Sequence, residues 1–412
     1  SLSQLEGALR NALKAPFYRR HLGEIEPRLR GLDDWKRLPV LEASHLVEHG
    51  PAVCSDMLTR PPGSHFLFSA GGTTGRMKYV AYSREEFDES KKIFGLGFRL
   101  TEMEPTDVVA NFMRAGAFWT AFIATNAGLE EVGCRILSMT ANQDDAVTLD
   151  YLRTFRPTAI VSITSNLVLL AQEAERQGFQ PKIDKVYYGG EHMPAPVEDY
   201  LRRVFGASTV RSMGYAAVEV GPIGFQCAHC RGTEHHVFED WCHVERDEEG
   251  DILVTTLGKT LQPLLRYRLG DRVDWVEEPC ACGRSAPRFR LLARSDDEIR
   301  LNTSNVYMSQ VFEAFAGIPE LSSFFQVVLE NEGALRKLTF RVELKQAGPV
   351  GEVAPLRARI LGALRERSKA LGAEFDLNLL APLVIEVLPA GGLERVGRTG
   401  KVRRFIDKRV AR

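Results

Sequence analysis

The stretch SHFLFSAGGTTGRMKYVAYSREEF, residues 64–87, decides the fold class. Two apolar runs flank a turn of glycine and threonine, and a helical pattern follows the second run. Ser83 and Glu86 have the spacing of a capping box, which predicts that a helix begins directly after the second strand. A glycine-rich turn lets backbone N–H groups approach an anion closely, and threonine hydroxyls add donors. The stretch therefore predicts a hairpin that holds phosphate, with a ligand-free hairpin turn as the alternative.

The glycine turn does not have the G-x-x-x-x-G-K-[ST] spacing of a P-loop NTPase. Other segments must therefore indicate which phosphate compound is bound. Short β-branched runs such as DVVANFM (107–113), AIVSI (159–163) and KVYYGG (185–190) alternate with helical patterns. This alternation predicts an α/β domain in which helices cover β-sheets.

The chain is expected to contain two domains. Antiparallel strands are predicted from residue 251 onward, and the composition shifts at RSDDEIRLNTSN (294–305). The segment that follows predicts a small α+β unit of about a hundred residues, a common domain size. The expected boundaries are 1–295 for a large N-terminal domain and 296–412 for a small mobile C-terminal domain.

Composition excludes several functional classes. The 412 residues are 44% hydrophobic and 26% charged, with a formal net charge of -1. No global field therefore attracts nucleic acid or an anionic membrane. The N-terminal residues predict an amphipathic helix and not a signal peptide, and no segment has the length and apolarity of a membrane span. We expect a cytoplasmic monomer or homodimer.

Segments far apart in the chain carry a family resemblance. SAGGTTGRMK (69–78) resembles the phosphate loop of adenylate-forming enzymes. The segments YAAVE (215–219), RYRLGD (266–271), ARSDD (293–297) and GRTGKVRRFIDKR (397–409) resemble, in the same order, later motifs of that superfamily.

Within the superfamily the chain is most similar to the phenylacetate–CoA ligase family. This similarity rests on the segments APFYRRHL (15–22), RLPVLEASHL (37–46), YYGGEHM (187–193) and NVYMSQVFE (305–313).

The resemblance implies a role for each matching residue. Lys401 would be the catalytic lysine, Glu219 would bind Mg²⁺, and Asp296 would be the hinge between the domains. The residues implied to bind ATP, its phosphates or AMP are Ser69, Gly71, Gly72, Thr73, Thr74, Gly75, Lys78, Gly190, Glu191, Tyr215, Asp271 and Arg294. Taken singly, Asp271 could cap a turn, Glu219 could be an exposed carboxylate and Lys401 could belong to a solvated basic run.

The implied activity is an ATP-dependent, AMP-forming ligation. A carboxylate attacks the α-phosphorus of ATP, and Mg²⁺ and Lys401 neutralise the developing charge. CoA is the acceptor that the resemblance implies. Thr303 stands where related enzymes carry a glycine, so an amine or a carrier protein is an open alternative, as is an unusual acid. Val218 replaces the usual Ser or Thr, and an inactive nucleotide- and zinc-binding interaction protein is the alternative from another class.

Four of the seven cysteines form close pairs. Cys227 and Cys230 form a C-x-x-C pair, and Cys280 and Cys282 form a C-x-C pair, which together supply four ligands for a tetrahedral structural zinc. The family pattern would instead use Cys230, His236, Cys280 and Cys282. Five candidates for four places leave one residue to be excluded, either Cys227 or His236, and free thiols packed as small hydrophobic groups are the alternative.

An acid-binding pocket is expected after the strand at 107–113. NFMRAGAFWTAF (111–122) places Phe112, Phe118 and Trp119 where the resembled family binds an aryl acid. Aromatic rings could stack on that acid, although ordinary core packing explains each of them equally well. Tyr187, Tyr188 and Gly189 border the expected pocket. The default substrate is a small aromatic carboxylic acid.

Overall fold

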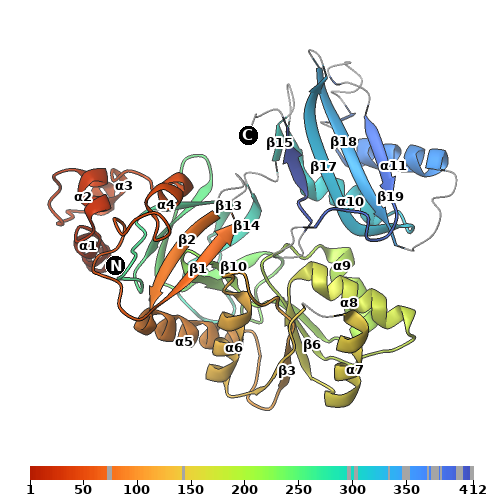
Figure 1. The fold of residues 1–412 in the computed structure, drawn as a ribbon, viewed down its shortest axis with the longest axis horizontal. Helices are drawn as coiled ribbons and strands as arrows, with labels where there is room; N and C mark the ends of the chain where they lie inside the picture. The colour runs from red at the N-terminus through yellow and green to blue at the C-terminus, as the bar shows by residue number, and fades with distance from the viewer. Residues whose placement is uncertain are drawn as a thin grey trace. The chain divides into compact units, whose positions relative to one another are not determined.

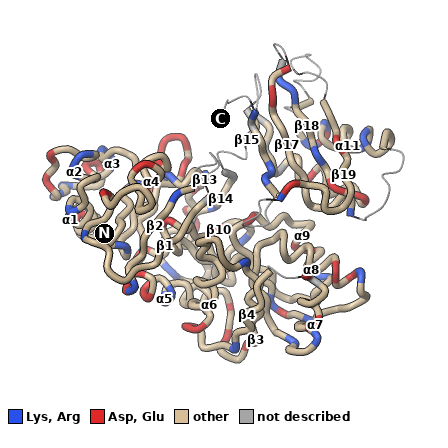
Figure 2. Tube along the Cα trace, viewed as in Figure 1, with Lys and Arg blue, Asp and Glu red and all other residues tan. Residues whose placement is uncertain are grey.

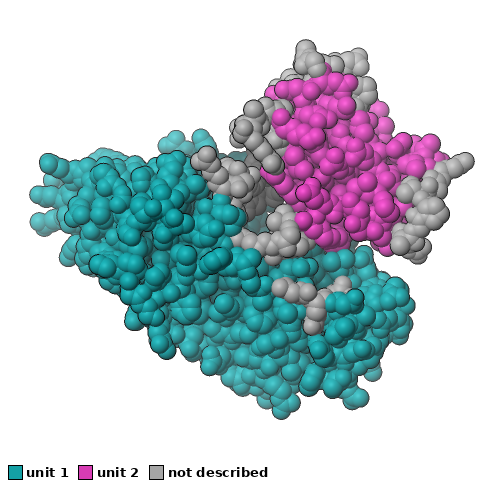
Figure 3. Space-filling model, in the orientation of Figure 1, with its two compact units in different colours: residues 1–292 teal, residues 293–412 magenta. Residues whose placement is uncertain are grey.

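The computed structural model describes residues 1–71, 77–141, 144–294, 298–300, 305–332, 335–345, 353–368, 371–372, 380, 383–395 and 402–408. The chain divides into two compact units, residues 1–292 and residues 293–412, which Figure 3 distinguishes by colour. Each unit has its own sheets and is described separately below.

The glycine-rich stretch forms the predicted hairpin. Strand β1 (His65–Gly71) pairs antiparallel with β2 (Met77–Ser83), and Phe68 lies opposite Val80. Helix α5 (Arg84–Leu100) follows directly, and Ser83 and Glu86 form the expected capping box. The prediction of two paired strands followed by a helix is confirmed, and the residues predicted to form the turn, 72–76, lie outside the described residues.

The first sheet of the large unit is parallel, in the order β4-β3-β5-β6-β7. Its strands are β3 (Val108–Asn111), β4 (Arg135–Ser138), β5 (Ala159–Ser162), β6 (Lys185–Tyr188) and β7 (Thr209–Ser212). The connecting helices are α6 (Ala121–Val132), α7 (Asp145–Phe155), α8 (Thr164–Arg176) and α9 (Ala195–Phe205). Helices α7, α8 and α9 lie together on one side of this sheet, and α6 lies on the other (Figure 1). The predicted α/β fold class is confirmed.

The second sheet of the large unit has seven strands in the order β11-β12-β13-β14-β10-β9-β8. Its strands are β8 (Tyr215–Ala217), β9 (Gly221–Phe225), β10 (Glu234–Val237), β11 (Cys242–Arg246), β12 (Asp251–Thr256), β13 (Tyr267–Val276) and β14 (Arg288–Arg294). The strands predicted after residue 251 are present, and β12 pairs antiparallel with β13. Strands β8, β9 and β10 were not predicted, because they are short and lack a clear apolar alternation.

Four short helices at the N-terminus pack against this second sheet. They are α1 (Leu2–Ala12), α2 (Pro16–Leu22), α3 (Leu32–Lys36) and α4 (Ala43–His49). Trp35 and Tyr18 are fully buried in one core with Tyr267 of β13. The segment between α3 and α4 also runs along β13, since Leu41 accepts the N–H of Arg268 at 3.0 Å. The N-terminal helices therefore hold the strand that carries Tyr267 and Asp271.

The small unit contains a mixed sheet in the order β19-β18-β17-β20 and a separate hairpin. Its elements are β15 (Glu298–Arg300), β16 (Asn305–Tyr307), α10 (Met308–Ala316), β17 (Leu321–Glu332), β18 (Leu335–Leu344), α11 (Val353–Arg367), β19 (Val384–Leu388) and β20 (Phe405–Asp407). Phe315 of α10 packs edge-to-face on Phe325 of β17, with ring centroids 5.1 Å apart. The predicted α+β pattern is confirmed for the described part of this unit.

Charged residues of both signs are interspersed along both units (Figure 2), in keeping with the formal net charge of -1. Among the residues that the structure describes, no helix combines the length and the apolar character needed to cross a membrane.

A buried carboxylate joins the start of α5 to the loop after β12. Glu86 is 4% exposed. Its carboxylate accepts the N–H groups of Ser83 at 2.8 Å and of Thr260 and Leu261 at 2.5 Å each. Charge-assisted bonds of this kind are stronger than neutral ones. Glu86 therefore fixes the hairpin and its helix to the second sheet.

Replacing Glu86 by glutamine should destabilise the large unit. The glutamine amide would place its own N–H donors where three main-chain N–H groups already converge. Some of these buried N–H groups would then lose their acceptor. We expect Glu86→Gln to lower the free energy of unfolding by about 1–3 kcal/mol, measured by urea denaturation. Glu85→Gln is the matched control, because Glu85 is exposed. Equal midpoints for both variants would contradict this role of Glu86.

Candidate active site

The second sheet brings together two residues that the sequence assigned to nucleotide binding. Tyr215 lies on β8 and Asp271 on β13, and the Tyr215 hydroxyl donates a hydrogen bond to the Asp271 carboxylate. The Tyr215 ring also packs edge-to-face on Phe289 of β14, with centroids 5.7 Å apart. An aromatic face beside a carboxylate offers stacking for a base and acceptors for sugar hydroxyls.

A buried ion pair lies in the same unit. Lys78 of β2 pairs with Glu219, and their side chains are 11% and 6% exposed. The Tyr267 hydroxyl accepts a hydrogen bond from Lys78 Nζ at 3.1 Å and donates one to Glu219 Oε1 at 3.1 Å. Glu219 is therefore not an exposed carboxylate. The sequence did not single out Tyr267, because an aromatic residue inside a strand is ordinary core composition.

A second buried lysine holds the main chain at Glu219. Lys259 is 1% exposed, and its Nζ donates to the Glu219 carbonyl oxygen at 2.6 Å. The same Nζ lies 3.8 Å from the centre of the Tyr82 ring. Burial lowers the pKa of Lys259 to about 8, opposed by the nearby carboxylates of Glu86 and Glu219. Nothing in the sequence distinguishes this residue, because a single lysine in a loop is usually solvated.

The glycine-containing turn after β6 is hydrogen-bonded to the start of helix α8. Gly190 has a positive φ of 68°, a left-handed conformation that favours glycine. The Glu191 carboxylate accepts the N–H of Ser165 at 2.7 Å and its hydroxyl at 3.1 Å, at the N-terminus of α8. A carboxylate is stabilised there by the helix dipole. In this structure Glu191 therefore anchors the turn, and the nucleotide contact that the resemblance implies stays a prediction.

An apolar cavity of about 120 Å³ lies within the large unit. Its aromatic wall is formed by Phe68, Phe87, Phe94 and Trp119, and its other walls include the Gly189–Gly190 and Met213–Gly214 turns and residues 216–218. Of the predicted pocket residues, Trp119 and Gly189 line it. Ala216 and Val218, which depart from the family pattern, also line it. The cavity is suited to a small apolar group.

Four other predicted pocket residues lie outside the lining of this cavity. Tyr187 is fully buried, and its hydroxyl donates to Thr101 O at 2.9 Å. Phe112 is 1% exposed and continues the strand β3, where its N–H bonds to Val161 O at 2.9 Å, so it is held in the core of the parallel sheet. Phe118 is 58% exposed and packs edge-to-face on Tyr79. Tyr188 is partly buried, and burial raises its pKa to about 12. Aromatic composition alone therefore did not distinguish the wall of the cavity from its surroundings.

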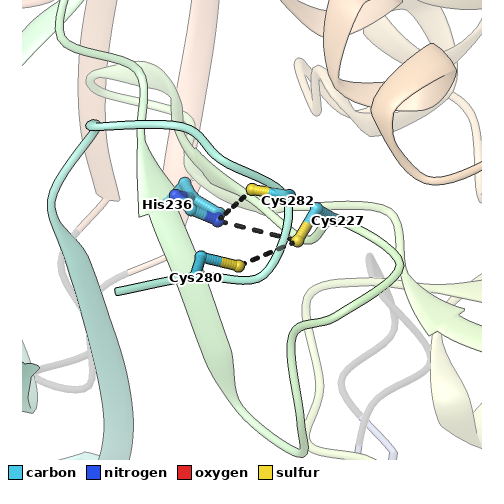
Figure 4. Close-up of side chains that lie close together, drawn as sticks. All are labelled: Cys227, His236, Cys280 and Cys282. Atoms are coloured by element: carbon cyan, nitrogen blue, oxygen red, sulfur yellow. Dashed lines mark hydrogen bonds between the residues drawn. The ribbon is translucent and has the colours of Figure 1, made fainter. Parts of the chain in front are cut away.

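Three thiols and one imidazole converge beside the second sheet (Figure 4). Cys227 Sγ lies 3.6 Å from His236 Nε2 and 3.5 Å from Cys280 Sγ, and Cys282 Sγ lies 3.5 Å from His236 Nε2. His236 Nδ1 lies 3.1 Å from Ala286 O, which directs Nε2 toward the thiols. Burial lowers the pKa of His236, which favours the neutral ligand form.

The fifth zinc candidate, Cys230, lies at the edge of this group. Its Sγ is 3.6 Å from Cys227 Sγ and accepts the N–H of Cys227 at 3.4 Å. The ligand atoms that lie within 4.8 Å of one another belong to Cys227, His236, Cys280 and Cys282. This set has the soft and borderline donors that tetrahedral zinc requires. It differs both from the four cysteines and from the set that the family pattern implies.

Several predicted site residues lie outside the described residues. They are Gly72, Thr73, Thr74, Gly75, Asp296, Thr303 and Lys401. The main chain of Gly71 and Arg294 belongs to β1 and β14. Ser69 is described fully, and it is 1% exposed with its hydroxyl 3.3 Å from Ala117 O.

The effects of replacing Lys78 and Glu219 on the free energy of unfolding should be strongly coupled. Removing one partner leaves an uncompensated buried charge, so Lys78→Met is expected to lower the free energy of unfolding by about 3–5 kcal/mol. Lys78→Met/Glu219→Leu should recover most of that loss, because no isolated charge remains. Urea denaturation measures both. Lys92→Met is the control, because Lys92 and Glu89 form an exposed pair (58% and 52%) that should not move the midpoint. A Lys78→Met midpoint equal to that of Lys92→Met would overturn this prediction.

Comparisons with known proteins show what the chain is similar to. The model of the AMP-binding enzyme C-terminal domain matches residues 303–409. A phenylacetate-coenzyme A ligase of Thermus thermophilus is 27% identical over 96% of this chain and 93% of its own length. An indoleacetate–lysine synthetase of Pseudomonas savastanoi is 27% identical, over 48% of this chain and 51% of its own length.

A solved structure supports the fold. A 2-hydroxyisobutyryl-CoA ligase in complex with 2-HIB-AMP, in the postadenylation state, has a TM-score of 0.80 at 22% identity and covers 99% of this chain and 89% of that one. The family model and the curated relatives named phenylacetate-coenzyme A ligase agree with the motifs quoted above. Over nearly its whole length the chain is therefore similar to phenylacetate–CoA ligases, and its C-terminal part matches a domain model of the AMP-binding enzymes.

Proposed function

We propose that this protein uses ATP to convert a small aromatic carboxylic acid to an acyl-adenylate and then transfers the acyl group to an acceptor. One observation carries the proposal. The short segment 213–219 lines the apolar cavity with residues 216–218 and also contains Tyr215 and Glu219. An acid in the cavity would therefore lie beside residues suited to a nucleotide.

The chemistry needs positioning more than proton transfer. A carboxylic acid is already ionised at neutral pH, so no general base is required. Its oxygen attacks the α-phosphorus, the bond to the β-phosphate breaks, and pyrophosphate leaves. Both reactants are anionic, so the rate depends on alignment and on neutralising charge. Asp271 would hold the ribose hydroxyls, and Lys401 would neutralise charge at the α-phosphate.

Glu219 offers an oxygen ligand of the kind that Mg²⁺ prefers. Bound Mg²⁺ supplies positive charge near the phosphates. The partner of Glu219 in this structure is the ammonium group of Lys78, so the site already accommodates a cation at that carboxylate. The Lys259 bond to the Glu219 carbonyl keeps the carboxylate at one position.

CoA is the first candidate for the acceptor, because the full-length curated relatives are named as CoA ligases. An amine is the second candidate. It is favoured by Thr303, which occupies the place of a glycine in the family pattern, and by the partial match to a synthetase that is named for lysine. We further propose that residues 296–412 act as a lid that turns about Asp296, a hinge motion common in two-step enzymes.

Pyrophosphate exchange into ATP with a panel of aryl acids tests the proposed function. Lys401→Ala should reduce exchange roughly 100- to 1,000-fold, by analogy with the loss of one preorganised donor. Lys408→Ala is the matched control from the same basic segment, since Lys408 is half-exposed and pairs with Glu330. Exchange by Lys401→Ala at the parental rate would contradict the assignment. ATP binding without exchange for every acid would favour the inactive binding protein.

We also propose that Cys227, His236, Cys280 and Cys282 hold a structural zinc ion. All four places would be filled by protein, which leaves no open position for catalysis. The use of thiols as metal ligands suits a reducing compartment, which supports the expected cytoplasmic location.

Metal analysis of single variants tests the zinc proposal and selects the fourth ligand. The parent should contain one zinc per chain by mass spectrometry, and Cys227→Ser should lose it and unfold at a lower temperature. Cys230→Ser should keep the metal, because Cys230 lies at the edge of the group. Cys134→Ser is a control at a cysteine that belongs to no candidate metal group of the described residues. Loss of zinc in Cys230→Ser and retention in Cys227→Ser would reverse the ligand assignment.

A further inference from the structure

A buried hydroxyl group in the wall of the apolar cavity has no hydrogen-bond partner among the described residues. Thr125 lies on α6, is 0% exposed and lines the cavity. Within the part of the chain that the structure describes, its Oγ1 has no hydrogen-bond partner. A buried polar group without a partner is costly, so such groups are rare unless a ligand or water satisfies them. This hydroxyl marks a place where a bound molecule would supply the missing bond.

The neighbouring helix presents a second hydroxyl to the same cavity. Ser90 of α5 is 3% exposed, and its Oγ donates to Phe87 O at 2.9 Å. The Ser90 oxygen therefore keeps acceptor capacity. Helices α5 and α6 approach closely where Gly128 faces Phe94, because a Cβ at Gly128 would lie 2.9 Å from the Phe94 Cβ. The two helices thus form one wall that contains hydroxyl groups among apolar side chains.

The position of this wall indicates which part of an acid it would contact. The carboxylate of the acid must face the nucleotide residues Tyr215 and Glu219. These two residues belong to segment 213–219, which forms a different part of the cavity wall. Thr125 lies on a helix and not on that segment. If the carboxylate lies at that segment, a ring substituent is the group available to contact Thr125.

The volume of the cavity limits the size of the ring that can bind in it. An apolar cavity of about 150 Å³ accepts benzene, and this cavity measures about 120 Å³. Its volume is therefore of the order that a single six-membered ring occupies. The aromatic side chains Phe87, Phe94 and Trp119 in the wall offer edges and faces for such a ring.

We propose that Thr125 determines specificity in the acid pocket, and that the acid is a single-ring aromatic carboxylic acid with a hydroxyl or amino substituent that hydrogen-bonds to Thr125. The inference rests on the proposed function, because it assumes that the cavity holds the acid. Both substituents share one chemistry, a polar group that can donate or accept at the threonine hydroxyl. A site built to bond such a group discriminates strongly against an analogue that lacks it.

The test compares paired acids in pyrophosphate exchange. Benzoate is compared with its three hydroxy and three amino isomers in the parent, in Thr125→Val and in Thr125→Ser. The parent should prefer one hydroxy or amino isomer over benzoate, and Thr125→Val should reduce that preference, as a ratio of kcat/KM values, by roughly 10- to 100-fold. Thr125→Ser keeps the hydroxyl and should restore most of it. The ranking of hydroxy against amino isomers identifies the substituent.

Two further measurements separate a specificity role from a structural one. Thr125→Val replaces an unpaired hydroxyl with a methyl group of the same shape, so the melting temperature of the free protein should stay equal or rise. Thr148→Val is the matched control, because Thr148 is a fully buried helical threonine whose hydroxyl donates to Asp144 O at 3.2 Å. It should lower the melting temperature and leave the preference between acids unchanged.

A thermal-shift assay with the same acids distinguishes failure of this inference from failure of the proposed function. Substituted acids that stabilise the parent but not Thr125→Val, without any exchange, would support the pocket and contradict the adenylation activity. An unchanged ratio of kcat/KM values in Thr125→Val would overturn the inference while the activity stands. Equal stabilisation by benzoate and by every substituted acid would overturn it as well, as would no stabilisation by any of them.

Discussion

The buried pair of Lys78 and Glu219 is the interaction on which the arrangement of the large unit depends. Two charges removed from water are tolerated only when each has a close partner and the remaining polar atoms are bonded. Tyr267 meets this requirement by bonding to both groups. The three residues belong to the glycine-rich hairpin, to the turn after β8 and to β13. One polar contact therefore fixes three segments that are far apart in the sequence.

Main-chain bonds explain how segment 213–219 can depart from the family pattern and still keep its course. Tyr82 donates to the Val218 carbonyl oxygen at 2.9 Å, and Lys259 donates to that of Glu219 at 2.6 Å. Neither bond involves the side chain at position 216 or 218. Alanine and valine at these positions instead add apolar surface to the cavity. The substitutions therefore change the wall of the pocket more than the position of Glu219.

The cysteine and histidine group has a different physical basis. Cys227 precedes β10, His236 lies within it, and the pair Cys280 and Cys282 lies in the loop between β13 and β14. Strand β10 pairs with β14, and Arg288 lies directly opposite His236. Sheet pairing therefore brings the C-x-C loop to the histidine. The spacing of the cysteines correctly predicted that the two pairs lie close together. The choice between Cys227 and Cys230 depends on which thiol points toward the imidazole.

The sequence by itself determined the α/β class, the paired strands with the capped helix that follows them, and most of the regular elements, because these depend on local periodicity and capping. Its ordered motifs also indicated the resemblance to phenylacetate–CoA ligases. It also identified Glu219, Tyr215 and Asp271 as residues that belong together. Only the tertiary structure decided which aromatic residues form the wall of the cavity, since Trp119 lines it whereas Phe112 and Phe118 do not. It alone placed Lys259 and Tyr267 beside Glu219 and left the Thr125 hydroxyl without a partner. The physical reason is that burial and bonding of a single side chain depend on neighbours from other elements, which no local pattern encodes.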